Sequence, residues 1–147
     1  MPRTPIEIPG SQLIEATTFP ARRRIHRGRT SYLKGLAAEK SAEQLYQQKG
    51  AKILGRRVRT PYGELDLVAE QDGVLIFVEV KAQQRQSGWD SPVSDQQWRR
   101  LKNAANHYMI SILSETGVQP SCRFDVAVMD RIGKLSIYEN ACGFDEH

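Results

Sequence analysis

The 147-residue sequence has few cysteines and no long apolar run. Its two cysteines, Cys122 and Cys142, form no CxxC pair and cannot build a disulfide framework, which favours a reducing cytoplasm. The longest apolar run, Val74–Val78, is far shorter than the roughly 18 to 20 residues that a membrane-spanning helix needs. The sequence therefore predicts a cytoplasmic protein that is not embedded in a membrane.

Several common enzyme signatures are also missing. The sequence contains no phosphate-binding P-loop and no dinucleotide-binding fingerprint. Its three histidines show no zinc-ligand spacing, and neither cysteine has a visible catalytic base near it. These absences argue against zinc-dependent and thiol-dependent catalysis.

The sequence does contain a basic N-terminal segment. Residues 1–34 carry seven Lys and Arg against two acids, a net charge of +5, whereas residues 35–147 carry −1. Prolines punctuate the first twenty residues, and three arginines follow: Arg22, Arg23 and Arg24. We predict a flexible arm over residues 1–30, either a solvated tail or a nucleic-acid-binding arm. An organelle transit peptide stays open as a third interpretation.

Local patterns predict one α/β domain over residues 31–147. Apolar residues at helical spacing predict a helix between Ser31 and Gly50, and a second helix from Ser94 to about Thr116. Alternating runs predict strands at 51–59, 64–70, 74–82, 123–130 and 135–138, and residues 83–92 read as a loop. The order is helix, three strands, helix and two strands, which we interpret as a mixed central sheet flanked by helices.

The strongest functional signal is the hairpin of the second and third strands. Asp72-Gly73 is a two-residue turn signal. A turn there places Asp66 opposite Glu79 and Glu64 opposite Lys81, all on one face. The other face is continuously apolar and is expected to pack on the core, through Leu65, Leu67, Ala69, Val74, Ile76, Val78 and Val80. The charged face also carries apolar side chains nearer the turn, at Val68, Leu75 and Phe77.

Two facing carboxylates repel each other, and burial worsens the repulsion unless one protonates or a cation lies between them. A divalent ion between Asp66 and Glu79 removes the conflict, and oxygen ligands favour Mg²⁺, or Mn²⁺ in its place. Lys81 can neutralise charge on a phosphate or activate the attacking water. The alternative is a half-exposed strand end on which Glu64 pairs with Lys81 and Asp66 is solvated. The apolar flanks favour the metal site.

This pattern resembles the Asp…Glu-x-Lys signature of the PD-(D/E)XK nuclease superfamily, which includes Holliday junction resolvases and many restriction enzymes. The element order resembles that superfamily's αβββαβ core. More narrowly, the sequence resembles the YraN-like family of small bacterial proteins, often described as endonucleases. The matching stretches are Gly35-Leu36-Ala37-Ala38-Glu39, Gly63-Glu64-Leu65-Asp66-Leu67-Val68-Ala69, Phe77-Val78-Glu79-Val80-Lys81, Arg123-Phe124-Asp125-Val126 and Asn140-Ala141.

The resemblance implies a restriction-endonuclease-like domain with a metal site. Asp66, Glu79 and the backbone carbonyl of Val80 would bind the ion, and Lys81 would be the catalytic lysine. Glu39 matches an acid on the first helix that often joins the site, although an ordinary surface glutamate fits its position equally well.

Two residues depart from the family pattern. Gln83 stands where the family usually has a basic residue, and Gln97 stands where a lysine is common early in the second helix. Both changes weaken the implied contacts with phosphate.

Other candidate contacts with nucleic acid are less specific. Three basic residues of the second helix lie opposite its apolar stripe, where they either bind phosphates or form a solvated face: Arg99, Arg100 and Lys102. Trp89 either stacks on a base or covers the edge of the core. Arg123 and Asp125 are expected on a core strand, with the arginine paired to an acid.

These observations lead to one main functional hypothesis and two alternatives. The main hypothesis is a Mg²⁺-dependent endonuclease that hydrolyses phosphodiester bonds in DNA, including branched DNA, with a homodimer as one arrangement for cutting two strands. The first alternative is a nucleic-acid-binding module with the nuclease fold and little or no turnover, suggested by Gln83 and Gln97. The second is a protein-interaction adaptor whose carboxylates are incidental.

Overall fold

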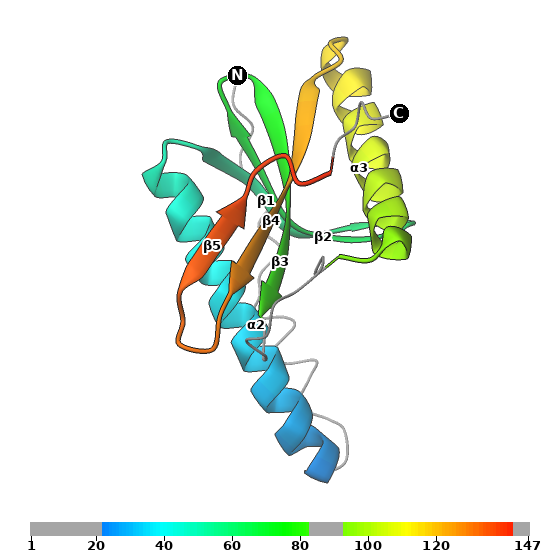
Figure 1. Ribbon diagram of the computed structural model, residues 1–147. Coiled ribbons are helices and arrows are strands. Elements are labelled where there is room, and N and C mark those ends of the chain that lie inside the picture. The colour runs from blue at the N-terminus through cyan, green and yellow to red at the C-terminus, as the bar shows by residue number, and fades with distance from the viewer. Residues whose placement is uncertain (1–21, 83–92, 143–147) are drawn as a thin grey trace.

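A computed structural model describes residues 22–82 and 93–142, with side chains from Tyr32 onward. Within these ranges two helices cover opposite faces of a five-stranded sheet (Figure 1). The helices are α2 (Arg22–Gln48) and α3 (Asp95–Thr116). The strands are β1 (Lys52–Thr60), β2 (Gly63–Gln71), β3 (Val74–Ala82), β4 (Ser121–Met129) and β5 (Leu135–Tyr138). The predicted α/β class is confirmed, and the layout is consistent with a restriction-endonuclease-like core.

The sheet is mixed, and its strands follow the order β1-β2-β3-β4-β5. Strands β3 and β4 are parallel, whereas the other neighbours are antiparallel. Helix α3 lies between β3 and β4 in the chain, as a parallel pair requires a crossover. In the parallel register Glu79 pairs with Val126 and Ala82 with Met129, so both strands end at the same edge of the sheet.

Local signals in the sequence fix the turns and helix ends. Asp72 and Gly73 have positive φ angles of 54° and 81°, as a tight hairpin turn needs. At the start of α3, the Ser94 hydroxyl accepts the Gln97 N–H at 3.1 Å, and the Gln97 side chain accepts the Ser94 N–H at 3.0 Å. A lysine has no acceptor atom and could not close this capping box. The departure at Gln97 therefore has a structural role.

Each helix buries its own apolar cluster against the sheet. The cluster under α3 contains Val68, Leu75 and Phe77, which were predicted to share one face of the hairpin. The cluster under α2 contains Leu67, Ala69, Ile76 and Val78 from the other face, with Val80 packed against it. Leu65 was predicted to lie with this second set, but it belongs to the α3 cluster instead. The alternation of side chains is therefore interrupted between Leu65 and Leu67.

Helix α2 begins at Arg22 rather than near Ser31, so part of the predicted arm is helical. No proline lies between Pro20 and Pro61, and arginine is a strong helix former, so the helix continues through the expected N-cap at Ser31. The N-terminal half of α2 extends beyond the sheet (Figure 1). Neither α2 nor α3, the helices within the described ranges, contains an apolar stretch able to cross a membrane. Residues 1–21 lie outside the described part of the chain.

Candidate functional site

The hairpin of β2 and β3 opens where its acidic residues lie. The ladder between the strands follows the predicted alignment from Gln71↔Val74 to Leu67↔Val78. At the next position the Asp66 Oδ2 atom accepts the backbone N–H of Val80 at 2.9 Å. The carboxylate thus takes the place of a backbone acceptor at the end of the ladder. The predicted cross-strand pairs Asp66–Glu79 and Glu64–Lys81 do not continue the described ladder, because a side chain has replaced the backbone pairing.

The neighbouring strand is irregular at the same level. Pairs Arg56↔Leu67 and Val58↔Leu65 flank the position where Arg57 faces Asp66, and Arg57 has a left-handed φ of 47°. A non-glycine residue in this region is strained and is held there by its surroundings. Because of this conformation Arg56 and Arg57 both reach residues of α2, although consecutive strand residues normally point to opposite faces. The irregularity brings Arg57 to the acidic end of the hairpin.

Helix α2 supplies a third carboxylate to this region. The Arg57 Nε atom donates to Glu39 Oε1 at 2.9 Å, and its terminal nitrogen donates to Glu39 Oε2 at 3.2 Å. The same guanidinium lies 5.7 Å from the centre of the Tyr32 ring. The Tyr32 hydroxyl is buried and has no hydrogen-bond partner among the described residues. A buried unpaired hydroxyl beside these charges marks a polar space that a water or ligand oxygen can complete.

The three carboxyl groups of Glu39, Asp66 and Glu79, called here the acidic cluster, resist ionisation together. Burial raises the pKa of Glu79 to about 7, and the charge of Asp66 adds to the rise while Lys81 opposes it. Burial also raises the pKa of Asp66, against the lowering effect of the Val80 N–H. The pKa of Glu39 rises to about 7 through burial and the charge of Asp66, although Arg57 opposes the rise. An added cation is the simplest way to relieve this crowding.

Lys81 lies within the site and is paired with one of its acids. The Lys81 Nζ atom is 3.3 Å from Glu79 Oε2. Glu64, which the alternative interpretation paired with Lys81, instead lies 3.5 Å from the exposed Arg59. Asp66 is partly buried and bonded to the Val80 N–H rather than solvated. The geometry of a solvated strand end is therefore not found.

The donor set suits a divalent ion that shares its coordination with substrate. No group of three or more His, Cys, Asp or Glu side chains is placed to hold a metal within residues 22–82 and 93–142. The protein offers the neighbouring carboxylates of Asp66 and Glu79, while Arg57 holds Glu39. Magnesium commonly binds through one or two carboxylates and fills its remaining positions with water and phosphate oxygens. The residues present fit that mode of binding.

The predicted phosphate-binding residues lie at different distances from the acidic cluster. Arg100 crosses the start of β2: a Cβ atom added at Gly63 would lie 2.9 Å from its guanidinium. This contact places Arg100 three residues along the strand from Asp66. Arg99 is exposed and Lys102 is partly buried. Three predicted contacts begin α2 at positions whose side chains are outside the description: Arg22, Arg23 and Arg24. Gln83 and Trp89 lie outside the described residues.

A second buried carboxylate, Asp125, is fully surrounded by donors. Arg123 donates to its two oxygens at 3.0 and 3.2 Å, and the Tyr46 hydroxyl donates to Oδ2 at 2.6 Å. The backbone N–H of Asn140 donates to Oδ1 at 2.9 Å. These four residues, called here the Asp125 cluster, confirm the predicted pairing of Arg123 with an acid. They join two of the sequence stretches that carried the family resemblance.

Sequence reasoning missed Arg57 and Tyr32. Arg57 reads as an ordinary strand residue, and its left-handed conformation has no glycine or asparagine to signal it. Tyr32 lies seven residues before Glu39 on α2, about two helical turns away and on the same side. That spacing was the available signal, and it becomes visible once the helix is known to begin at Arg22.

Comparison with known proteins places the chain in a family. The family model described as "Uncharacterised protein family UPF0102" matches residues 38–129. A UPF0102 protein of Cereibacter sphaeroides is 33% identical over 114 residues, which cover 78% of this chain and 96% of that protein. A UPF0102 protein of Granulibacter bethesdensis is 38% identical over 124 residues, covering 84% and 77%. One from Ruegeria pomeroyi is 36% identical over 117 residues, covering 80% and 94%. The chain therefore belongs to the UPF0102 family, the YraN-like family that its sequence resembled.

Proposed function

We propose that this protein is a metal-dependent endonuclease that hydrolyses phosphodiester bonds in DNA, with a site of the PD-(D/E)XK type. The observation that carries the proposal is the pair of the partly buried Asp66 and the buried Glu79, with Lys81 beside it. Two adjacent acids with raised pKa values and a lysine within 3.3 Å are costly for stability and suited to binding a cation and a phosphate. Mg²⁺ is the proposed ion, and Mn²⁺ could replace it.

Each residue has a distinct part in this proposal. Asp66 and Glu79 bind the ion with the backbone carbonyl of Val80, and the Val80 N–H orients the Asp66 carboxylate. An ion there would supply Lewis-acid stabilisation of the scissile phosphate and make a nearby water more acidic. Lys81 leaves its ion pair with Glu79 to neutralise charge that develops on the phosphate. Glu39, held by Arg57, positions a water at the side of the cluster that faces α2.

A cleavage assay on the full-length chain tests the reaction. We expect branched, nicked or single-stranded DNA to be cut with Mg²⁺ or Mn²⁺ and not with EDTA. Asp66→Ala, Glu79→Ala and Lys81→Ala should each abolish cutting. Glu70→Ala is the matched control, because Glu70 is an acid on β2 outside the acidic cluster. Cutting that survives EDTA, or that survives loss of Asp66 and Glu79, contradicts the proposal.

Calorimetric titration with Mg²⁺ or Mn²⁺ tests the site without relying on cleavage. We expect the wild-type protein to bind the ion with release of protons, because the pKa of Glu79 is raised to about 7 and this acid is partly protonated near neutral pH. Asp66→Asn should remove this binding while keeping an acceptor for the Val80 N–H. Equal heats from both proteins would show that the pair is not a metal site.

The second candidate is a DNA-binding module with the nuclease fold and little turnover. It is favoured by the use of Gln97 in the α3 capping box, where a lysine would contribute charge. Salt-sensitive DNA binding with no cleavage under any metal would support this candidate.

Cutting of both DNA strands would support two active sites in a homodimer, which analytical ultracentrifugation would detect.

A further inference from the structure

A pocket of about 280 Å³ lies next to the acidic cluster but shares none of its residues. Its lining comes from α2, the ends of β3 and β4, and the turn that follows β4: Lys34, Ala37, Ala82, Met129, Asp130, Arg131 and Gly133. Ala82 directly follows Lys81 on β3, and Met129 is its partner on β4. Because consecutive strand residues point to opposite faces, the pocket lies on the α2 face of the sheet, at the end of the strand that carries the proposed catalytic lysine.

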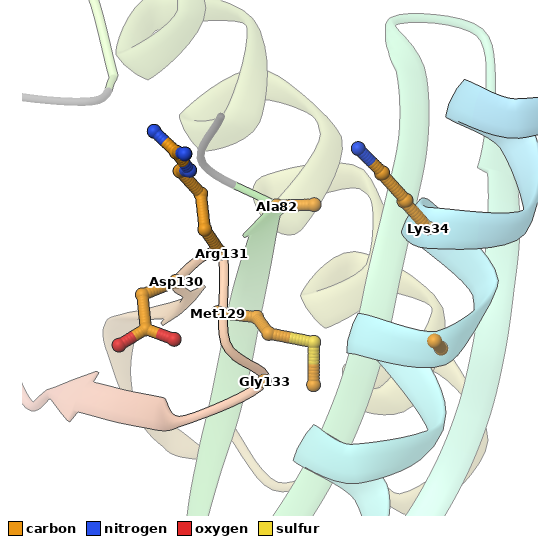
Figure 2. A pocket seen from close by; sticks show the side chains of 7 residues that line it. Lys34, Ala82, Met129, Asp130, Arg131 and Gly133 are labelled. Atoms are coloured by element: carbon orange, nitrogen blue, oxygen red, sulfur yellow. The ribbon is translucent and has the colours of Figure 1, made fainter. Parts of the chain in front are cut away.

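The pocket presents two cations from separate elements. In Figure 2, Lys34 and Arg131 rise on either side of Ala82. Within residues 22–82 and 93–142 neither side chain has an ion-pair partner, and both are exposed. Two uncompensated cations that share one hollow attract an anion more strongly than either does alone.

The acid in the lining is already committed to the local backbone. Asp130 Oδ1 accepts the N–H of Ile132 at 3.0 Å and the N–H of Lys134 at 2.8 Å. Figure 2 shows its carboxylate directed away from Lys34 and Arg131. These bonds fix the turn that carries Arg131, and because Asp130 forms no ion pair with either cation, the three charged residues of the lining keep a net charge of +1.

We propose that Lys34 and Arg131 form a subsite for a backbone phosphate of DNA, flanking the phosphate that the acidic cluster would cleave. Lys34 lies five residues before Glu39 on α2, about 7.5 Å along the helix axis. The inference rests on the proposed nuclease function for its substrate. The inference adds the path of the DNA strand beyond the cleavage site, which runs across the ends of β3 and β4 towards the β4–β5 turn.

Equilibrium binding of a fluorescein-labelled DNA duplex to the full chain in EDTA tests the subsite apart from cleavage. The double variant Lys34→Ala/Arg131→Ala should weaken binding about tenfold or more near 0.1 M salt. It should also make the negative slope of log K against log salt shallower by about 1.8, for two lost phosphate contacts. The matched control is Lys40→Ala/Lys134→Ala, which removes the same charge from the same helix and the same turn outside the pocket. The charge-conserving double variant Lys34→Arg/Arg131→Lys should show the same salt dependence of binding as the wild type.

A second variant keeps the charge constant. Ala37 is exposed on α2 and lines the pocket, so Ala37→Phe should fill the hollow without disturbing the core and should weaken binding. Gln44→Phe, at another exposed position of α2, is its control and should bind as the wild type does. Thermal unfolding of each variant checks that the fold is intact.

The outcomes separate the subsite from the proposed function. Equal losses in the pocket double variant and its control, or no DNA binding by the wild type, would overturn the subsite. Selective loss of binding in the pocket variants of a protein that never cuts DNA would support the subsite and count against the nuclease. Tighter binding of single-stranded RNA than of DNA, with the same dependence on Lys34 and Arg131, would overturn DNA as the ligand.

Discussion

The acidic cluster and the Asp125 cluster both bury carboxylates in the same small sheet, yet they are built in opposite ways. Asp125 is surrounded by donors and receives four hydrogen bonds, from Arg123, Tyr46 and Asn140. Asp66 and Glu79 lie beside each other, and the pKa of each is raised mainly by burial. A satisfied buried charge holds a fold together, whereas a crowded one stores repulsion that a bound cation can relieve. The contrast indicates a structural role for the Asp125 cluster and is in line with the cation-binding role proposed for the acidic cluster.

Removing the central acid of the Asp125 cluster should have the largest effect on stability. Asp125→Ala leaves the Arg123 guanidinium and the Tyr46 hydroxyl without their buried partner, which costs about 3–5 kcal/mol of unfolding free energy. Asp66→Asn should be neutral or stabilising without metal, because it removes a repelling charge. Urea unfolding in EDTA measures both. Comparable destabilisation by the two changes would erase the distinction between the clusters.

The pH dependence of stability should come from the acidic cluster. The pKa of Glu39 and the pKa of Glu79 are both raised to about 7 in the folded state, above the ordinary value of 4.5. The folded protein therefore binds more protons than the unfolded chain between about pH 4.5 and pH 7, and its stability falls as pH rises through that window. In EDTA we expect a higher melting temperature at pH 5.5 than at pH 8.

Added Mg²⁺ and a double variant sharpen the same comparison. Mg²⁺ should raise the melting temperature most at pH 8, where the carboxylates are ionised and ready to bind it. Asp66→Asn/Glu79→Gln should abolish the response to Mg²⁺ and reduce the pH dependence to the share that Glu39 contributes through burial. If the double variant keeps the full pH dependence of stability, that dependence does not come from Asp66 and Glu79.

The two arginines should respond differently to truncation. Arg57 occupies a left-handed backbone conformation, which costs a non-glycine residue roughly 1–2 kcal/mol. Arg57→Gly should therefore be more stable than Arg57→Ala by about 1 kcal/mol, measured by urea unfolding. At Arg123, whose backbone is not in that region, alanine should be the more stable of the two. A preference for alanine at both positions would contradict the strain assigned to Arg57.

The smallest expected change in the free energy of unfolding comes from a comparison of the two halves of α2. Ala42 and Tyr46 are buried against the sheet near the Asp125 cluster, whereas a Cβ atom added at Gly35 meets no atom within 4 Å. Gly35→Ala should raise the free energy of unfolding by about 0.5–1 kcal/mol through helix propensity alone. If DNA binding also falls in this stabilised variant, the open surface at Gly35 is needed for close approach of the strand. A loss of stability would show that the space is not open in solution.

Local sequence patterns predicted most of the helices and strands, and they identified the hairpin of β2 and β3. The turn at Asp72-Gly73, the cap at Ser94 and the alternating runs are local, so the strand and α3 boundaries agree with prediction to within about two residues. The predicted start of α2 was wrong, because the arginine-rich sequence before Ser31 is itself helical and the N-cap signal at Ser31 does not end that helix. The face assigned to Leu65 was wrong because strict alternation was assumed through an irregular stretch.

The sequence by itself determined the order of helices and strands, the family and the presence of two acids and a lysine at one end of a buried hairpin. These follow from spacing along the chain, which periodicity and turn chemistry report directly. Only the tertiary structure decided that Arg57 holds Glu39, that Asp66 caps the ladder at Val80, and that Lys34 and Arg131 share a pocket. Each of these contacts joins segments that are distant in sequence, and their geometry depends on how the sheet twists and how α2 packs across it.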